Sequence, residues 1–579
     1  MLNRIISVIM SFLISTTGVA YSSLNSVIDS VSEMIFGLPL TAQAIKADFL
    51  DEITDSDVVE LDEDTAYVKN KIAVFIDGEM SFFEKRALFK SCSGTLVGWS
   101  APADIYVIRY PDMTYNETVE KCKSICEKDG VALAMPVLAY KTDKNMTPND
   151  TFGNDSENPV VWDEKKPNGN NWWLEAICAR QAWDYSSYFS KINIGIADAG
   201  FQLDHPELAG KISFPNSRLA GRNAPDSHGT HVAGIIGARQ NNGVGISGIC
   251  ENSQMICVDW MPDFLQYWNA DLAIFFGFSA LVKAGAKVIN FSLGTSASKT
   301  SNSSAIDERL YVPMAISLMM SSLLSKGYDF VAVQSAGNGD FFGNPIDAEN
   351  NGYFSAINSG NIFTGFNSVP AQEILDRIII VGSAEVYNET EFIQSDFSNV
   401  GSSVDISAPG KNIYSCSINS DYQDMSGTSM SAPVVTGVAS LVWSVNPSFK
   451  GSQVKEIVCT SSDKVAQINN DITYVHGVDL QEYPLVNAKL AVEEAIRRTY
   501  SVGTVEGKTD NQAVAEVLYD GVSHTVFSDG TYSFVAPEGS GAVQQLDSDN
   551  NVVSSFDITV TAGQTTVVSD DVSAEIPAA

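Results

Sequence analysis

Hydrophobic and polar positions follow a layered pattern through the middle of the chain. Short apolar runs rich in Val and Ile alternate with longer stretches of helical spacing between about residues 160 and 498. Such runs are typical of strands that are buried on both faces of a parallel sheet. The expected strands are 192–197, 254–258, 287–291, 330–335 and 378–382, and the expected helices are 269–284, 313–326 and 432–445. Because strands and helices alternate, the pattern predicts an α/β fold with a doubly wound, mostly parallel sheet.

Two further patterns flank this region. Residues 66–140 predict a small α+β domain, and residues 500–579 predict a small β-sandwich whose strands are separated by Asp, Gly and Ser turns. In the first region we expect strands at 67–76, 95–99, 105–108 and 131–138, and helices at 79–89 and 118–128, the second capped by Asn116. In the second region we expect strands at 502–505, 513–518, 525–527, 530–535, 541–546 and 557–560.

The beginning of the chain predicts export. Residues 1–20 combine a short basic start, an apolar run and small residues suited to cleavage, as in a bacterial-type signal peptide. The apolar run is short for a membrane span, and we expect no span after signal removal. Residues 21–65 are acidic and mixed, and predict a weakly ordered lead-in. Residues 141–159 are polar, and predict an exposed processing linker before the main domain at 160–498.

Composition narrows the function classes. The chain has 579 residues, of which 44% are hydrophobic and 18% charged, so it can bury a large core and is not a disordered protein. Its formal net charge of -35 argues against nucleic-acid binding, which requires basic surface. The eight cysteines show no zinc-binding spacing, and we expect most to be small buried core residues or free thiols. An exported chain could form some disulfides, but their pairing does not follow from the sequence.

Three motifs carry candidate chemistry. Asp198 ends an apolar strand, His228 lies in a glycine-bounded stretch that runs into a helix, and Ser429 precedes an apolar helix with Pro433 in its expected first turn. A serine hydroxyl needs a base to become nucleophilic, and a histidine base needs an acid to orient it. The order Asp, His, Ser is one of the known solutions to acyl transfer.

A fourth residue suits the same reaction. Asn338 follows an expected strand in a turn of small residues. Its amide can donate to the developing oxyanion together with the Ser429 N–H, and one such donor contributes about 3 kcal/mol of transition-state stabilisation.

The chain resembles the subtilisin family (subtilases, peptidase S8) over about residues 160–495. The resemblance rests on Asp198-Ala199-Gly200, on the His228 motif through Gly234, and on Gly427-Thr428-Ser429-Met430. It implies a catalytic Asp198, His228 and Ser429 with Asn338 in the oxyanion hole, and it gives His228, rather than His231, the role of proton carrier. It also implies substrate-binding walls, formed by Ser292, Leu293, Gly294, Ala336 and Gly337.

The same resemblance implies a zymogen. Residues 66–140 resemble the family's inhibitory propeptide, which acts as an intramolecular inhibitor, and the tail resembles carboxypeptidase regulatory-like modules. The expected protein is a self-processed serine endopeptidase, secreted or at the cell surface, that acts on protein or peptide substrates. It needs no cofactor or catalytic metal, while some relatives hold a structural calcium ion.

Departures from the family pattern keep an alternative open. Ala199 stands where relatives usually carry Ser or Thr, and Ser431 replaces a common Ala. Apparent insertions at 297–309 and 340–369 flank the expected cleft. The alternative is a catalytically weak surface or interaction protein that uses the β-sandwich for binding.

The remaining histidines and acids have simpler interpretations. His205, His231, His476 and His524 are expected to be structural. Asp204 and Glu207 could reach a calcium ion in some relatives, but exposed surface carboxylates are the commoner case.

Overall fold

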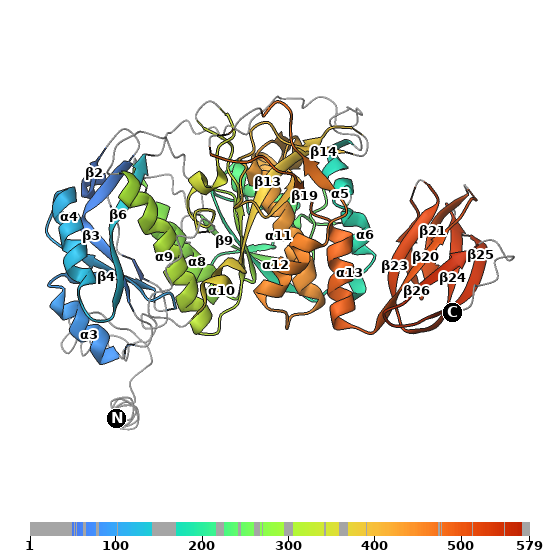
Figure 1. The fold of residues 1–579 in the computed structure, drawn as a ribbon, viewed down its shortest axis with the longest axis horizontal. Coiled ribbons are helices and arrows are strands. Elements are labelled where there is room, and N and C mark those ends of the chain that lie inside the picture. The colour runs from blue at the N-terminus through green and yellow to red at the C-terminus, as the bar shows by residue number, and fades with distance from the viewer. Residues whose placement is uncertain are drawn as a thin grey trace, which may run out of the picture.

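The computed structural model describes residues 49–569 with gaps, the longest of which cover 142–168, 216–224, 260–266, 295–304 and 358–368. The described residues form three successive units (Figure 1): an N-terminal sheet with two helices, a central sheet between helices, and a C-terminal pair of sheets. The predicted signal peptide 1–20 lies outside the described residues, as do residues 142–159 of the predicted linker.

The N-terminal unit is an antiparallel sheet in the order β1-β4-β5-β3-β6, with β2 paired to β3. The strands are Phe49–Leu50 (β1), Val58–Glu60 (β2), Thr65–Ile76 (β3), Thr95–Ser100 (β4), Ile105–Arg109 (β5) and Val131–Lys141 (β6), and the helices are Phe82–Ser91 (α3) and Tyr115–Cys126 (α4). Strands β1 and β2 fall within the segment expected to be a weakly ordered lead-in. Both are nevertheless paired in the sheet: Phe49 of β1 lies opposite Trp99 of β4, and Val58 of β2 lies opposite Val68 of β3.

The cap of helix α4 differs from the expected one. Asn116 is exposed inside the helix, whereas Thr114 accepts a hydrogen bond from the Glu117 N–H, and Glu117 accepts one from the Thr114 N–H. This reciprocal pair is a capping box, which satisfies two N–H groups of the first turn.

The central sheet confirms the predicted doubly wound, mostly parallel α/β fold. Its order is β19-β18-β14-β13-β12-β11-β7-β9-β8, with β15 paired to β13. The strands are Ile192–Asp198 (β7), Ile212–Ser213 (β8), Ser253–Asp259 (β9), Val288–Phe291 (β11), Val331–Ser335 (β12), Ile378–Val386 (β13), Phe392–Gln394 (β14), Ile406–Pro409 (β15), Val465–Gln467 (β18) and Tyr483–Pro484 (β19). A separate hairpin joins Ile413–Cys416 (β16) to Tyr422–Met425 (β17).

Successive residues of the central strands enter two different cores. In β12, Val331 and Val333 belong to one cluster of buried side chains, and Ala332 to another. The first cluster includes residues of Trp172–Ala176 (α5), Ala179–Trp183 (α6), Ser227–Gly237 (α7), Thr428–Val445 (α11), Gly451–Thr460 (α12) and Ala488–Thr499 (α13). The second includes residues of Ala270–Lys283 (α8), Ala305–Ser325 (α9) and Ala371–Leu375 (α10). Burial on both faces explains why these strands are continuously apolar.

The N-terminal unit packs on α8 and α9. Phe75 of β3 meets Phe275 of α8 edge to face, with ring centroids 5.6 Å apart, and the second core contains residues of both units. Figure 1 shows these helices between the two sheets. A short strand from the central part of the chain, Tyr267–Trp268 (β10), extends the N-terminal sheet at its edge. It pairs antiparallel with Tyr140 and Lys141 of β6.

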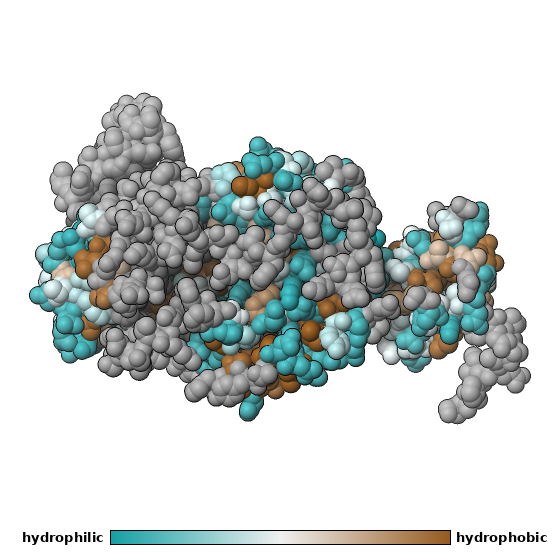
Figure 2. All heavy atoms as spheres, turned by 90° about the horizontal axis from the view of Figure 1, so that it is seen from above, coloured by the Kyte–Doolittle hydropathy of each residue, from teal (hydrophilic) through white to brown (hydrophobic). Residues whose placement is uncertain are grey.

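The C-terminal unit contains two sheets, in the orders β23-β20-β26 and β22-β21-β24-β25. The strands are Val502–Lys508 (β20), Val514–Tyr519 (β21), Val522–Thr525 (β22), Thr531–Pro537 (β23), Gly539–Asp547 (β24), Val552–Val560 (β25) and Thr565–Ser569 (β26). Strand β22 ends at Thr525, so the predicted strand 525–527 is wrong, and β26 has no counterpart in the prediction. Figure 2 shows this unit as a separate lobe beside the central one.

The lobe is attached through the hydroxyl of Tyr185. This hydroxyl donates to Oε1 of Glu493 in α13 at 2.6 Å and accepts the backbone N–H of Val535 in β23 at 3.0 Å. Tyr185 is 2% exposed, so the attachment is buried. The two units are therefore joined by packing and hydrogen bonds as well as by the chain.

Candidate active site

Asp198 is the last residue of β7, which lies between β11 and β9 in the sheet. Side chains at the carboxyl ends of parallel strands gather at one edge, where α/β proteins place their sites. The carboxylate is buried, with 1% of the residue exposed. Its Oδ1 accepts the Ala199 N–H at 2.8 Å.

His228 lies in the first turn of α7. Asp226 caps this helix, because its Oδ1 accepts the His228 N–H at 2.7 Å. A β-carbon on Gly229 would overlap the carbonyl oxygen of Ala199, so only glycine lets the start of α7 approach the loop after β7. The glycine after the histidine is thus a requirement for bringing His228 to Asp198.

Acid and base are in direct contact. Nδ1 of His228 lies 2.6 Å from Oδ1 of Asp198, which leaves Nε2 as the nitrogen that can face a substrate. Burial raises the pKa of Asp198 above its usual value, and the contact with His228 acts in the opposite direction. Oδ2 of Asp198 is buried and has no hydrogen-bond partner among the described residues.

Ser429 lies inside the first turn of α11, which begins at Thr428. The expected start near Ala432 is therefore too late, and Pro433 is a residue of the helix interior. Ser429 itself is 7% exposed. Its hydroxyl donates to the Ser292 carbonyl at 3.4 Å, and its own carbonyl accepts the Ser292 hydroxyl at 2.7 Å. Among the described residues, no hydrogen bond joins Ser429 to His228, although their helices α11 and α7 pack together.

Asn338 is fixed by the residue that precedes Ser429. Its Oδ1 accepts both the backbone N–H and the hydroxyl of Thr428, each at 2.8 Å. The Thr428 hydroxyl in turn accepts the Gly337 N–H at 3.0 Å. Since Oδ1 is held by Thr428, the donor nitrogen Nδ2 occupies the other end of the amide, as an oxyanion donor requires.

The expected substrate walls follow the ends of two neighbouring strands. Ser292–Gly294 follows β11, and Ala336–Gly337 follows β12. Asn399 holds the second wall: its Nδ2 donates to the Ala336 carbonyl at 2.9 Å, and its Oδ1 accepts the Gly339 N–H at 3.0 Å. Asn399 could not be identified from the sequence, because nothing in its local pattern distinguishes a buried amide from an exposed one.

The described surroundings of Asp204 and Glu207 do not fit a structural calcium ion. Glu207 is fully buried, so its interpretation as an exposed carboxylate is wrong, whereas Asp204 is exposed as expected. The Glu207 carboxylate accepts hydrogen bonds from Asn242 at 2.7 Å, from the Ile246 N–H at 3.1 Å and from Tyr422 at 3.1 Å. Among the residues that the structure describes, no three His, Cys, Asp or Glu side chains are grouped to hold a metal.

Three other histidines are buried, and His476 lies outside the described residues. Nε2 of His231 faces the carbonyls of Ile413 and Gln423 at 2.9 and 3.1 Å, and burial lowers its pKa to about 3. Nε2 of His205 faces the Asp421 carbonyl at 3.0 Å. The ring of His524 stacks on Phe534 with centroids 3.9 Å apart. These contacts are structural, as predicted.

All eight cysteines are free thiols. Five are buried, Cys178 and Cys459 are partly exposed, and Cys126 is exposed. The expectation of core residues therefore holds for most of them.

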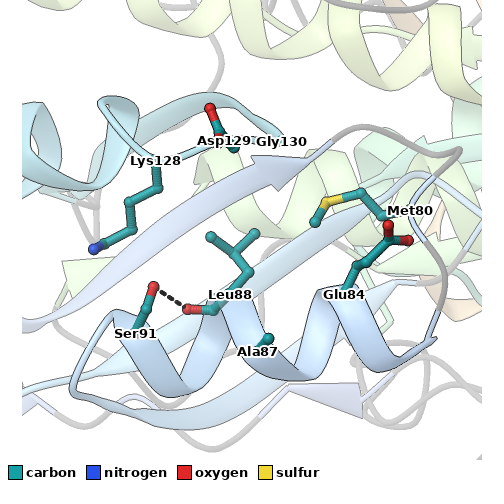
Figure 3. Close-up of a pocket in the computed structure, with 8 residues that line it drawn as sticks. All are labelled: Met80, Glu84, Ala87, Leu88, Ser91, Lys128, Asp129 and Gly130. Atoms are coloured by element: carbon teal, nitrogen blue, oxygen red, sulfur yellow. Dashed lines mark hydrogen bonds between the residues drawn. The ribbon is translucent and has the colours of Figure 1, made fainter.

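Two other features lie apart from the site. A surface depression of about 610 Å³ is lined by residues of α3 such as Leu88, by Met80 before this helix, and by residues after α4 such as Gly130 (Figure 3). It belongs to the N-terminal unit and contains none of the candidate residues. Helix α11 is long and apolar enough to cross a membrane, but its 18 residues are buried inside the protein, so it is the core helix that carries Ser429.

The chain matches a known protein family. The model described as "Subtilase family" matches residues 190–477. Thermitase of Thermoactinomyces vulgaris is 31% identical over 297 residues, which cover 50% of this chain and 88% of thermitase. The thermophilic serine proteinase of Bacillus sp. (strain AK1) is 25% identical over 416 residues, which cover 71% of this chain and 87% of that protein.

A solved structure has a similar fold. It is fervidolysin from Fervidobacterium pennivorans, described as a keratinolytic enzyme related to subtilisin, with a TM-score of 0.50 and 19% identity. The match covers 90% of this chain and 81% of fervidolysin. At this identity the likeness concerns the fold alone.

Proposed function

This chain belongs to the subtilase family of serine peptidases and acts on protein substrates, and from that premise we propose that Asp198, His228 and Ser429 are its catalytic triad. The observation that carries the proposal is the 2.6 Å contact between Nδ1 of His228 and the buried carboxylate of Asp198. Asn338, held next to Ser429 by Thr428, supplies the oxyanion donor.

The proposed mechanism follows from these positions. Rotation of the Ser429 side chain turns its hydroxyl from the Ser292 carbonyl to Nε2 of His228, which takes the proton as Oγ attacks the peptide carbonyl. Asp198 stabilises the resulting imidazolium. His228 then protonates the leaving amine, and water hydrolyses the acyl-enzyme by the same steps in reverse order.

The oxyanion is stabilised by two N–H donors. One is Nδ2 of Asn338, and the other is the backbone N–H of Ser429 in the first turn of α11. N–H groups of a first helical turn have no acceptor inside the helix, and the helix dipole favours negative charge there. The peptide itself is proposed to lie as an added strand beside Ser292–Gly294.

We further propose that the enzyme is made as a secreted zymogen. Residues 1–20 would direct export, residues 66–140 would inhibit the enzyme as a propeptide, and cleavage would fall in 141–159. The pairing of β6 with β10 supports this proposal, because it leads the end of the N-terminal sheet onto a strand of the peptidase unit. The peptidase domain would comprise 160–498, and 500–579 would form an accessory β-sandwich.

Substitution of the nucleophile tests the proposed triad. In the full chain, Ser429→Ala should abolish hydrolysis of a denatured protein substrate, labelling by a fluorophosphonate, and release of the N-terminal unit. Ser431→Ala is the matched control: it lies on the same turn, its hydroxyl donates to the Ala408 carbonyl at 3.1 Å, and it should keep all three properties. Hydrolysis that persists in Ser429→Ala would show that the assignment is wrong.

A further inference from the structure

Asn351 lies between the two walls expected to hold the side chain that precedes the scissile bond. A β-carbon added to Gly294 of the first wall would overlap the Asn351 amide. A β-carbon added to Gly337 of the second wall would lie 2.7 Å from Oδ1 of the same amide. One amide group thus lies against both walls, and beside Gly337 it is joined by Nδ2 of Asn399.

The Asn351 side chain is held in this place. Its Nδ2 donates to the Ser335 carbonyl at 2.8 Å, at the end of β12, and the residue is only 6% exposed. It ends a short 3-10 turn, Ala348–Asn351 (η5), which is capped by Asp347 through the Glu349 N–H at 3.1 Å. The turn is tied to the sheet region by the hydrogen bond from the Ala348 N–H to the Val400 carbonyl at 2.7 Å.

A second buried amide joins the walls to this turn. Gln334 is fully buried, and its Nε2 donates to the carbonyls of Leu293 at 3.1 Å and Gly352 at 3.4 Å. Its Oε1 accepts the Ser355 N–H at 3.0 Å. Spreading the walls to admit a large side chain would break these bonds and leave buried polar groups without partners, which is costly.

We propose that Asn351 restricts the enzyme to peptides with a small residue, such as Gly, Ala or Ser, immediately before the scissile bond. This inference rests on the proposed function of the site. A Phe or Leu side chain needs the volume that the Asn351 amide occupies, and its entry would also remove the hydrogen bond to Ser335. A Gly, Ala or Ser side chain does not need that volume.

Two substrates that differ only in the residue before the scissile bond test the proposal. For the processed wild type, kcat/KM should be at least about tenfold higher with Ala than with Phe at this position. Asn351→Ala should raise kcat/KM for the Phe substrate by about tenfold or more and change that for the Ala substrate much less. Asn350→Ala, one position earlier in the same turn, is the matched control and should keep the wild-type ratio.

The outcomes separate this inference from the proposed function. Preference of the wild type for Phe, or an unchanged Ala-to-Phe ratio in an Asn351→Ala enzyme that a fluorophosphonate still labels, would overturn the inference alone. Absence of both hydrolysis and labelling in the wild type would overturn the proposed function and the inference with it. If Asn351→Ala fails to fold, the wild-type ratio and Asn351→Ser decide the question.

Discussion

The amide oxygen of Asn338 accepts two hydrogen bonds from the same residue, Thr428, through its backbone N–H and its hydroxyl. The proposed oxyanion donor is therefore oriented by the residue next to the proposed nucleophile. Thr428 is a positioning residue in this arrangement, because it contacts Asn338 rather than the substrate.

Removal of the Thr428 hydroxyl should weaken the orientation of Asn338. We expect Thr428→Val to lower kcat by about tenfold, since one of two bonds to Oδ1 is lost and part of a donor's contribution of about 3 kcal/mol goes with it. KM should change little, and Thr428→Ser should restore kcat. Steady-state kinetics of the three enzymes measure this, and an equal loss in Thr428→Ser would show that the threonine methyl matters instead.

Ala199 follows Asp198, whose buried Oδ2 has no hydrogen-bond partner among the described residues. We expect the hydroxyl introduced by Ala199→Ser to donate to the Asp198 carboxylate, and a hydrogen bond to a charged group contributes about 1.5–3 kcal/mol. Such a bond favours the carboxylate, so it lowers the pKa of Asp198 and should extend activity to lower pH while raising kcat a few-fold. The pH profile of kcat measures this, with Ala199→Gly as the control; identical profiles would contradict it.

A buried acid fastens the N-terminal unit to the peptidase unit. Asp104, 1% exposed, pairs with Lys85 at 3.0 Å and contacts Ser322 and Lys326 of the α9 region. Asp104→Asn keeps the positive φ of 53° that asparagine tolerates but removes the charge. It should destabilise the full chain by about 2–4 kcal/mol, because the lysines lose their buried partner.

Thermal unfolding of Asp104→Asn in a Ser429→Ala background measures this without self-digestion. The matched control is Asp112→Asn, which breaks the exposed Lys69–Asp112 pair at 2.8 Å. Exposed pairs contribute about 0–1 kcal/mol, so this variant should unfold close to the parent temperature. Equal effects of the two variants would show that Asp104 does not fasten the units.

Buried His231 should make stability depend on pH. Its folded pKa of about 3 lies below the ordinary 6.5, so between these values the unfolded chain binds a proton that the native protein does not. Stability is therefore lost as pH falls from about 6.5 toward 3, by up to about 1.4 kcal/mol per pH unit. His231→Gln keeps a donor near the two carbonyls without titrating, so urea unfolding between pH 4 and 8 should show a smaller slope than the parent.

Much of the fold could be predicted because strands buried on both faces have a recognisable apolar sequence pattern. Strands β7, β9, β11, β12 and β13 have apolar residues on both faces, and each was expected within a few residues of its observed bounds. Helix α9 was expected to begin at Pro313 but begins at Ala305, since proline also occurs inside helices when packing compensates for the lost bond. Strand β26 was missed because its polar, half-exposed pattern resembles that of the neighbouring turns.

The candidate site divides in the same way. Asp198 and His228 could be predicted because each stands in a short motif whose neighbouring residues have structural roles, such as the close backbone approach at Gly229. The structure places the two side chains in contact. The contacts that Gln334, Asn351 and Asn399 make could not be predicted. Their partners lie on other segments, and an amide that spans two walls has the same sequence pattern as one that faces water.

The eight free thiols have a consequence for where the enzyme can work. No disulfide contributes to the fold, so a reducing agent has no cross-link to break. The folded enzyme should keep its activity in millimolar dithiothreitol and in air alike.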